Sequence, residues 1–189
     1  MSQTKLEWIL IAGFLLSHFL FLFIESNSSI FLGLSSLFFL LLSSQYMLLS
    51  KSAIYSLAFG LNSGSVIGIN MKLEHFRGAE VLITAGMVGY LLIALILSFT
   101  ARKYKHRIKG YGFLPYAITG LVIAQVVLSY FPDLAEYSGF LNYPILLFSG
   151  QILLSRVFRG PELQSFYYAL ILVLLSSGIF VLDQTISSL

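Results

Sequence analysis

The chain contains no cysteine, which excludes disulfide bonds, thiol nucleophiles and thiolate metal sites. Charge is also scarce, because Asp, Glu, Lys and Arg make up only 10% of its 189 residues, against about 25% in soluble domains. Hydrophobic residues make up 58% of the chain. So little polar surface cannot cover a water-facing globule. We therefore expect an integral membrane protein whose partners are membrane lipids, with no nucleic acid among them.

Seven segments are candidates for membrane-spanning helices, each of which needs about 20 mostly apolar residues. They cover residues 7–25, 29–50, 52–71, 80–100, 112–131, 139–157 and 163–186. The third is uncertain because it is rich in Gly, Ser and Asn. Short connections make neighbouring helices antiparallel. The sequence predicts an all-α polytopic transmembrane bundle that forms a single membrane domain over residues 1–189.

The positions of Lys and Arg favour seven spans, with the N-terminus inside and the C-terminus outside. Short cytoplasmic loops carry the excess of these residues. Seven spans place nine of the 11 inside and two outside, whereas the split is seven to four if 52–71 does not span. The N-terminal segment lacks a small-residue cleavage site and is expected to remain as a helix. We expect the protein in a bacterial cytoplasmic (inner) membrane.

Small residues repeat every four positions along segment 52–71. The members of this stripe are Ser56, Gly60, Gly64 and Gly68. In lipid, such a stripe lets another helix backbone approach closely. Two interpretations stay open: the stripe packs a helix of the same bundle, or it forms a face for self-association or another membrane subunit. Asn62 and Asn70 lie on other faces and are expected to form hydrogen bonds within the bundle or to line a polar cavity.

His18 and Asp183 are the ionisable residues that stand out inside the predicted spans. An ionisable group in a membrane marks a candidate functional site, since a charge at the bilayer centre costs about 2.5 to 3.5 kcal/mol. They are the catalytic candidates. The alternatives are an interfacial helix end for Asp183, which lies beside Gln184, and a neutral buried side chain for His18. No histidine pair has metal-ligand spacing, and no metal or cofactor is predicted.

A basic run lies between the fourth and fifth predicted spans. Its charged residues are Arg102, Lys103, Lys105, Arg107 and Lys109. These side chains are candidates for binding anionic lipid headgroups, at about 1 kcal/mol per basic residue near the surface. The alternative is that the run only anchors the topology.

The segment "GINMKLEHFRGAEVLITAG", residues 68–86, places a charged turn between two spans. The predicted turn residues are Lys72, His75, Gly78 and Ala79. With Gly68, Phe76 and Gly86, they resemble the helix–loop–helix of the gliding-motility protein GldL and its small membrane relatives, over about residues 55–100. Phe76 stands where that family has Trp, and the stretch 86–99 has no counterpart of its membrane glutamate. The resemblance implies a shared hairpin and not a shared motor function.

Two other segments resemble the lysoplasmalogenase-like YhhN family of membrane proteins. They are "FLGLSSLFFLLLSSQYM" at 31–47 and "SGIFVLDQTISSL" at 177–189. Gln45 and Tyr46 do not keep that family's His-x-x-Tyr step, and Asp183 lacks the preceding Ser. The resemblance implies a membrane-embedded enzyme that acts on lipids, with its acid pair broken here.

Two functions follow from these features. The preferred one is a non-enzymatic subunit or accessory of an envelope complex that acts through helix packing, motivated by the small-residue stripe and the lack of a catalytic set. The alternative is a lipid-acting enzyme or small-molecule carrier, with a cavity open to the outer side and Asp183 working with Gln184 or His18.

Overall fold

The computed structural model describes residues 3–24, 28–50, 52–104, 112–154 and 163–187, and within these ranges it is helical without strands. The elements are α1 (Gln3–Phe23), α2 (Ser28–Leu49), α3 (Ala53–Leu73), α4 (Ala79–Lys103), α5 (Leu114–Ser129), α6 (Pro132–Ser138), the 3-10 helix η2 (Gly139–Leu141), α7 (Asn142–Leu154) and α8 (Gln164–Ser187). Each predicted segment overlaps one of the helices α1, α2, α3, α4, α5, α7 and α8. The all-α bundle is therefore confirmed.

Four helices, α1, α2, α4 and α8, are long and apolar enough to cross a membrane. The apolar helices α5 and α7 are shorter, with 16 and 13 residues. Helix α3 has 21 residues, but its Asn and Ser side chains make it less apolar. The four long apolar helices indicate a membrane protein.

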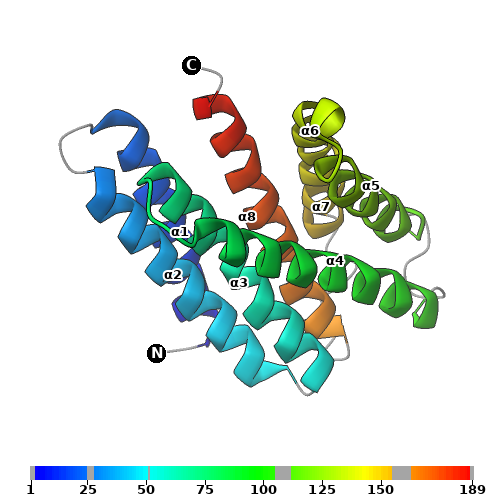
Figure 1. Ribbon diagram of the computed structural model, residues 1–189. Helices are drawn as coiled ribbons and strands as arrows, with labels where there is room; N and C mark the ends of the chain where they lie inside the picture. The colour runs from blue at the N-terminus through cyan, green and yellow to red at the C-terminus, as the bar shows by residue number, and fades with distance from the viewer. Residues whose placement is uncertain (1–2, 25–27, 51, 105–111, 155–162, 188–189) are drawn as a thin grey trace.

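Helix α8 lies at the centre of the bundle, between α1 and α7 (Figure 1). It packs against α2, α3, α4 and α7, and 61% of its most apolar stretch is buried, against 28 to 33% for the other three long apolar helices. Helices α5 to α7 lie on one side of α8, and the α1–α2 pair lies on the other. The hydrophobic core thus forms around α8.

Helices α3 and α4 approach closely because glycines meet at their contact. A Cβ atom placed on Gly86 would lie 2.0 Å from the backbone nitrogen of Ser65, and one on Gly89 would lie 2.2 Å from that of Asn62. On the other helix, a Cβ on Gly68 would lie 2.7 Å from the nitrogen of Ile83, and one on Gly64 would lie 3.0 Å from a backbone oxygen of α4. Two backbones this close leave no room for a methyl group.

The remaining members of the stripe face α2 of the same chain. Ser56 donates a hydrogen bond to the Met47 carbonyl at 3.1 Å. A Cβ on Gly60 would meet the end of the Met47 side chain at 3.4 Å. All four stripe residues therefore contact helices of this chain.

Buried polar side chains join α3 and α4 to α8. Asn62 donates to the Ser176 hydroxyl at 2.9 Å, and the Tyr90 hydroxyl bonds that of Ser177. All four residues are almost completely buried. These bonds satisfy the Asn62 amide nitrogen and the three hydroxyl groups, which would be costly to leave unpaired next to lipid.

Residues 132–138, which connect the predicted spans 112–131 and 139–157, form the short helix α6 and not a loop. Proline fits the first turn of a helix, because the N–H that it lacks would have no intrahelical partner there. Large side chains around α6 are exposed, among them Tyr130, Tyr137 and Phe140. Aromatic residues of this kind gather at membrane–water interfaces.

Candidate functional site

A partly open groove of about 770 Å³ runs between α1, α7 and α8. Ile11, Phe14, Leu153, Leu174 and other apolar side chains form most of its wall. The groove is also lined by His18, a titratable side chain deep in the predicted first span. Ligand pockets typically combine such a volume and apolar lining with a few placed polar groups.

Hydrogen bonds to α1 and α2 hold the His18 ring in place. Nδ1 lies 3.2 Å from the Phe14 carbonyl oxygen and 2.9 Å from the Ser35 hydroxyl. The Phe14 ring packs beside the imidazole, with 4.8 Å between ring centroids. His18 is 6% exposed, and Ser35 is completely buried. The ring therefore has a fixed orientation at the edge of the groove.

Asn70 extends this network to α3. Its Nδ2 donates to the Ser36 hydroxyl at 2.9 Å and lies 3.2 Å from the Leu32 carbonyl and 3.3 Å from the Ser35 hydroxyl. The buried amide of Asn70 thus joins α3 to the segment of α2 whose Ser35 contacts His18 of α1. The predicted hydrogen bonds of Asn62 and Asn70 within the bundle are confirmed.

Ser35 and His18 lie at the separation of a serine nucleophile and its base. Ser35, however, has no exposed surface and does not line the groove. The imidazole, and not the hydroxyl, therefore lines the groove. The arrangement orients a polar ring toward the groove.

A second polar cluster lies at the opposite end of α1 from His18. The Tyr46 hydroxyl donates to a carboxylate oxygen of Glu7 at 2.7 Å. The Tyr46 ring stacks on Tyr168 of α8, with 4.1 Å between centroids and 13° between planes. Sequence reasoning missed Glu7 because it stands at the edge of the first span. The spacing of Glu7 from Phe14 and His18 is the signal that could have found it, since these positions share one helix face.

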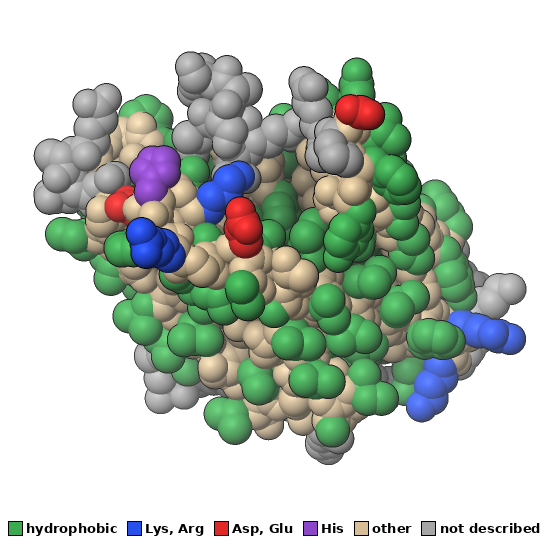
Figure 2. Space-filling model, in the orientation of Figure 1, with side chains coloured by type: hydrophobic (Ala, Val, Ile, Leu, Met, Phe, Trp, Pro, Cys, Tyr) green, Lys and Arg blue, Asp and Glu red, His purple; other side chains and the backbone are tan. Residues whose placement is uncertain are grey.

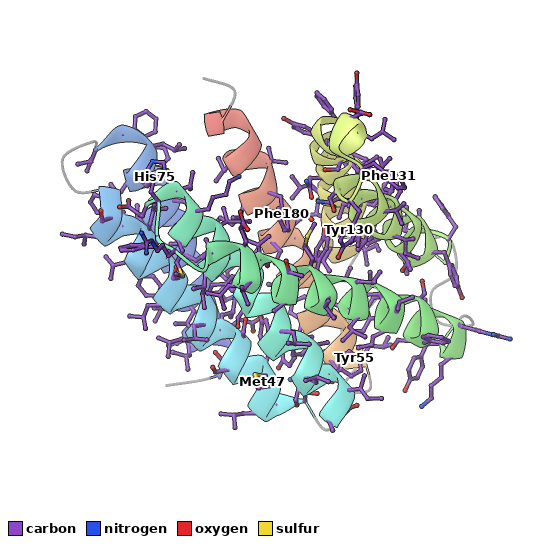
Figure 3. All side chains as sticks on the ribbon, in the orientation of Figure 1. Met47, Tyr55, His75, Tyr130, Phe131 and Phe180 are labelled. Carbon is purple, nitrogen blue, oxygen red and sulfur yellow. The ribbon has the colours of Figure 1, made fainter. Side chains whose placement is uncertain are left out.

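The predicted turn residues close α3 and open α4 at the end of the molecule opposite Met47 and Tyr55 (Figure 3). His75 has a φ of 58°, and the Phe76 N–H donates to the Met71 carbonyl at 2.8 Å. This is the hydrogen bond of a Schellman motif, which ends helices with a left-handed residue. Gly78 has a φ of 86° before α4 begins at Ala79. The two positive φ angles and the backbone hydrogen bond therefore define the shape of the turn.

Other predicted site residues fall partly outside the described structure. The side chains of Asp183 and Gln184 lie outside it, as do Lys105, Arg107 and Lys109. Arg102 and Lys103 are exposed at the end of α4. In the described part of the chain no three His, Cys, Asp or Glu residues gather as a metal site would require.

Comparison with protein-family models, curated proteins and solved structures finds no match to this chain.

Proposed function

We propose that this protein is a membrane-embedded carrier that binds one lipid-like molecule, with its apolar chain in the α1–α7–α8 groove. The groove is the observation that carries the proposal, because it joins an apolar wall to a fixed polar ring. The small-residue stripe supports packing inside this chain, where α2 and α4 already contact it.

The length of the groove fits a lipid chain. Its α8 side extends from Tyr167 to Leu182, which is about 22 Å at 1.5 Å per residue. Half of a bilayer core is about 15 Å thick, so one extended lipid tail fits within the groove.

Filling the groove at Gly178 is expected to abolish this binding. Gly178 lines the groove, and a Cβ placed there would meet nothing within 4 Å. Gly178→Leu therefore puts a bulky side chain into the groove without a backbone clash, and it removes a glycine that costs a helix about 1 kcal/mol. Lipids retained by purified protein, measured by native mass spectrometry, should fall from about one per chain to background.

The matched control is Gly120→Leu. Gly120 is an exposed helical glycine of α5, also with nothing within 4 Å of a Cβ. This variant should keep the wild-type lipid signal. Equal lipid retention by both variants would show that the groove is not the binding site.

We further propose seven spans in a bacterial inner membrane, with the N-terminus inside. Figure 2 supports a bilayer position, because charged side chains gather near the edges of a broad apolar face. The chain has no cysteine, so single cysteines report topology without background. An impermeant maleimide should label Phe76→Cys in intact cells, and Lys5→Cys and Lys103→Cys only after permeabilisation. All three residues are exposed. Labelling of Lys5→Cys and Phe76→Cys from the same side would mean that α3 does not span.

A further inference from the structure

Glu7 is a buried acidic residue of α1 that lies one helical turn before the groove-lining residue Ile11. It precedes Ile11 by four residues, and Ile11, Phe14 and His18 all line the groove. Positions separated by three or four residues lie on one helix face. Glu7 is 8% exposed. Its carboxylate therefore lies at the end of the face that forms one wall of the groove.

A stacked pair of tyrosines, Tyr46 and Tyr168, lies beside this carboxylate. Tyr46, which donates to Glu7, is completely buried against Tyr168. The chain neighbours of these residues, Trp8 beside Glu7 and Tyr167 beside Tyr168, line the groove. A molecule in the groove thus meets two aromatic side chains, Trp8 and Tyr167, whose chain neighbours belong to the Glu7 cluster.

The Glu7 carboxylate lacks a cationic partner within the described ranges. Its hydrogen bond comes from the neutral hydroxyl of Tyr46, and no ion pair joins it to Lys, Arg or His there. A charge taken out of water without a partner is costly. The carboxylate must therefore either hold a proton or pair with a cation that the described chain does not supply.

We propose that Glu7 is the counter-ion for a positively charged amine at one end of the bound molecule. This inference rests on the proposed lipid-like occupant and specifies its class as a cationic amphiphile. The amine lies between the carboxylate and the rings of Trp8 and Tyr167, which attract cations through their faces. Its tail extends along α8 toward His18, which is 11 residues or about 16 Å from Glu7 along α1. The hydrogen bond from the Tyr46 hydroxyl fixes the orientation of the carboxylate.

Trp8 provides the measurement, because it is the only tryptophan of the chain and it lines the groove. Brominated hexadecylamine, hexadecanol and hexadecanoate share one tail and differ only in the charge of the head. Each is added at a low mole fraction to protein in a mild detergent, and quenching of Trp8 fluorescence is followed to saturation. Quenching that increases linearly with the amount of probe, without saturating, reports random collisions. The same titration of Gly178→Leu measures this background.

The amine should saturate at a concentration at least about tenfold lower than the alcohol, since a hydrogen bond to a charged group contributes about 1.5 kcal/mol or more and about 1.4 kcal/mol is a tenfold change in affinity. Hexadecanoate should bind most weakly. In Glu7→Gln, a near-isosteric change, the amine should lose its advantage while the alcohol still binds. Thermal unfolding of the variant checks that the bundle persists.

The possible failures are distinguishable. Equal affinity of amine and alcohol for the wild type would overturn the counter-ion proposal and leave the groove as a binding site, with Glu7 holding a proton. This comparison needs no variant, so it stands even if Glu7→Gln does not fold. An absence of saturable quenching by all three probes would overturn the proposed function itself.

Discussion

Gly86→Ala is expected to lower the free energy of unfolding by about 3 kcal/mol or more, since overpacking a tight contact costs about 1 to 3 kcal/mol and backbone contacts cannot rearrange as side chains do. A Cβ at this position would lie 2.0 Å from the nitrogen and 2.3 Å from the Cα of Ser65. The α3 and α4 backbones must separate to admit it. Gly89→Ala should behave alike. Thermal unfolding in a mild detergent measures the effect.

Gly60→Ala is the matched control within the same hairpin. A Cβ there meets only the flexible end of Met47 at 3.4 Å. Alanine also favours a helix over glycine by about 1 kcal/mol. This variant should keep or slightly raise the unfolding temperature. If Gly86→Ala unfolded at the wild-type temperature, this result would contradict the close approach of the α3 and α4 backbones at Gly86.

Asn70→Ala is expected to cost about 2 kcal/mol, because removing a buried donor leaves its acceptors unsatisfied, at about 1 to 3 kcal/mol. Asn70 is 3% exposed and holds α3 to the Ser36 hydroxyl and the Leu32 carbonyl of α2. Its loss also loosens Ser35, which positions His18. Saturable quenching of Trp8 by the lipid probes should weaken together with stability.

Asn142→Ala is the comparison for this change. Asn142 is 1% exposed, but among the described residues its amide donates only to the Gly139 carbonyl three residues before it, at 3.1 Å. A local bond of this kind joins no helices. We expect a smaller loss of stability and no change in probe binding. Equal effects of both variants would mean that the inter-helix bonds of Asn70 contribute nothing of their own.

The positions of the helices could be predicted because hydropathy reports them directly. Runs of about 20 apolar residues have one stable backbone arrangement in lipid, in which every N–H and C=O is bonded within the segment. Helix α6 escaped prediction because Asp133 and Glu136 make its segment polar, as a loop would be. Only its proline indicated a helix start.

The candidate site was predicted less completely. His18 stood out because a histidine in a long apolar run is unusual. Glu7 lies only two residues from Lys5 at the water side of the same helix, where acidic residues are common. Its hydrogen bond comes from Tyr46, which is 39 residues away. Local sequence carries no information about a contact of that separation.

The sequence by itself indicated a lipid environment for this protein, the positions of its helices, and the small residues at which helices can approach closely. It left open which helix meets the stripe on α3, because a glycine face permits a close neighbour without specifying one. The tertiary structure decided that α2 and α4 fill that face. It also brought α1, α7 and α8 together around one groove, with a histidine on its wall and a carboxylate at the opposite end of α1. Such a site exists only once distant segments pack, because each of them supplies one part of its wall.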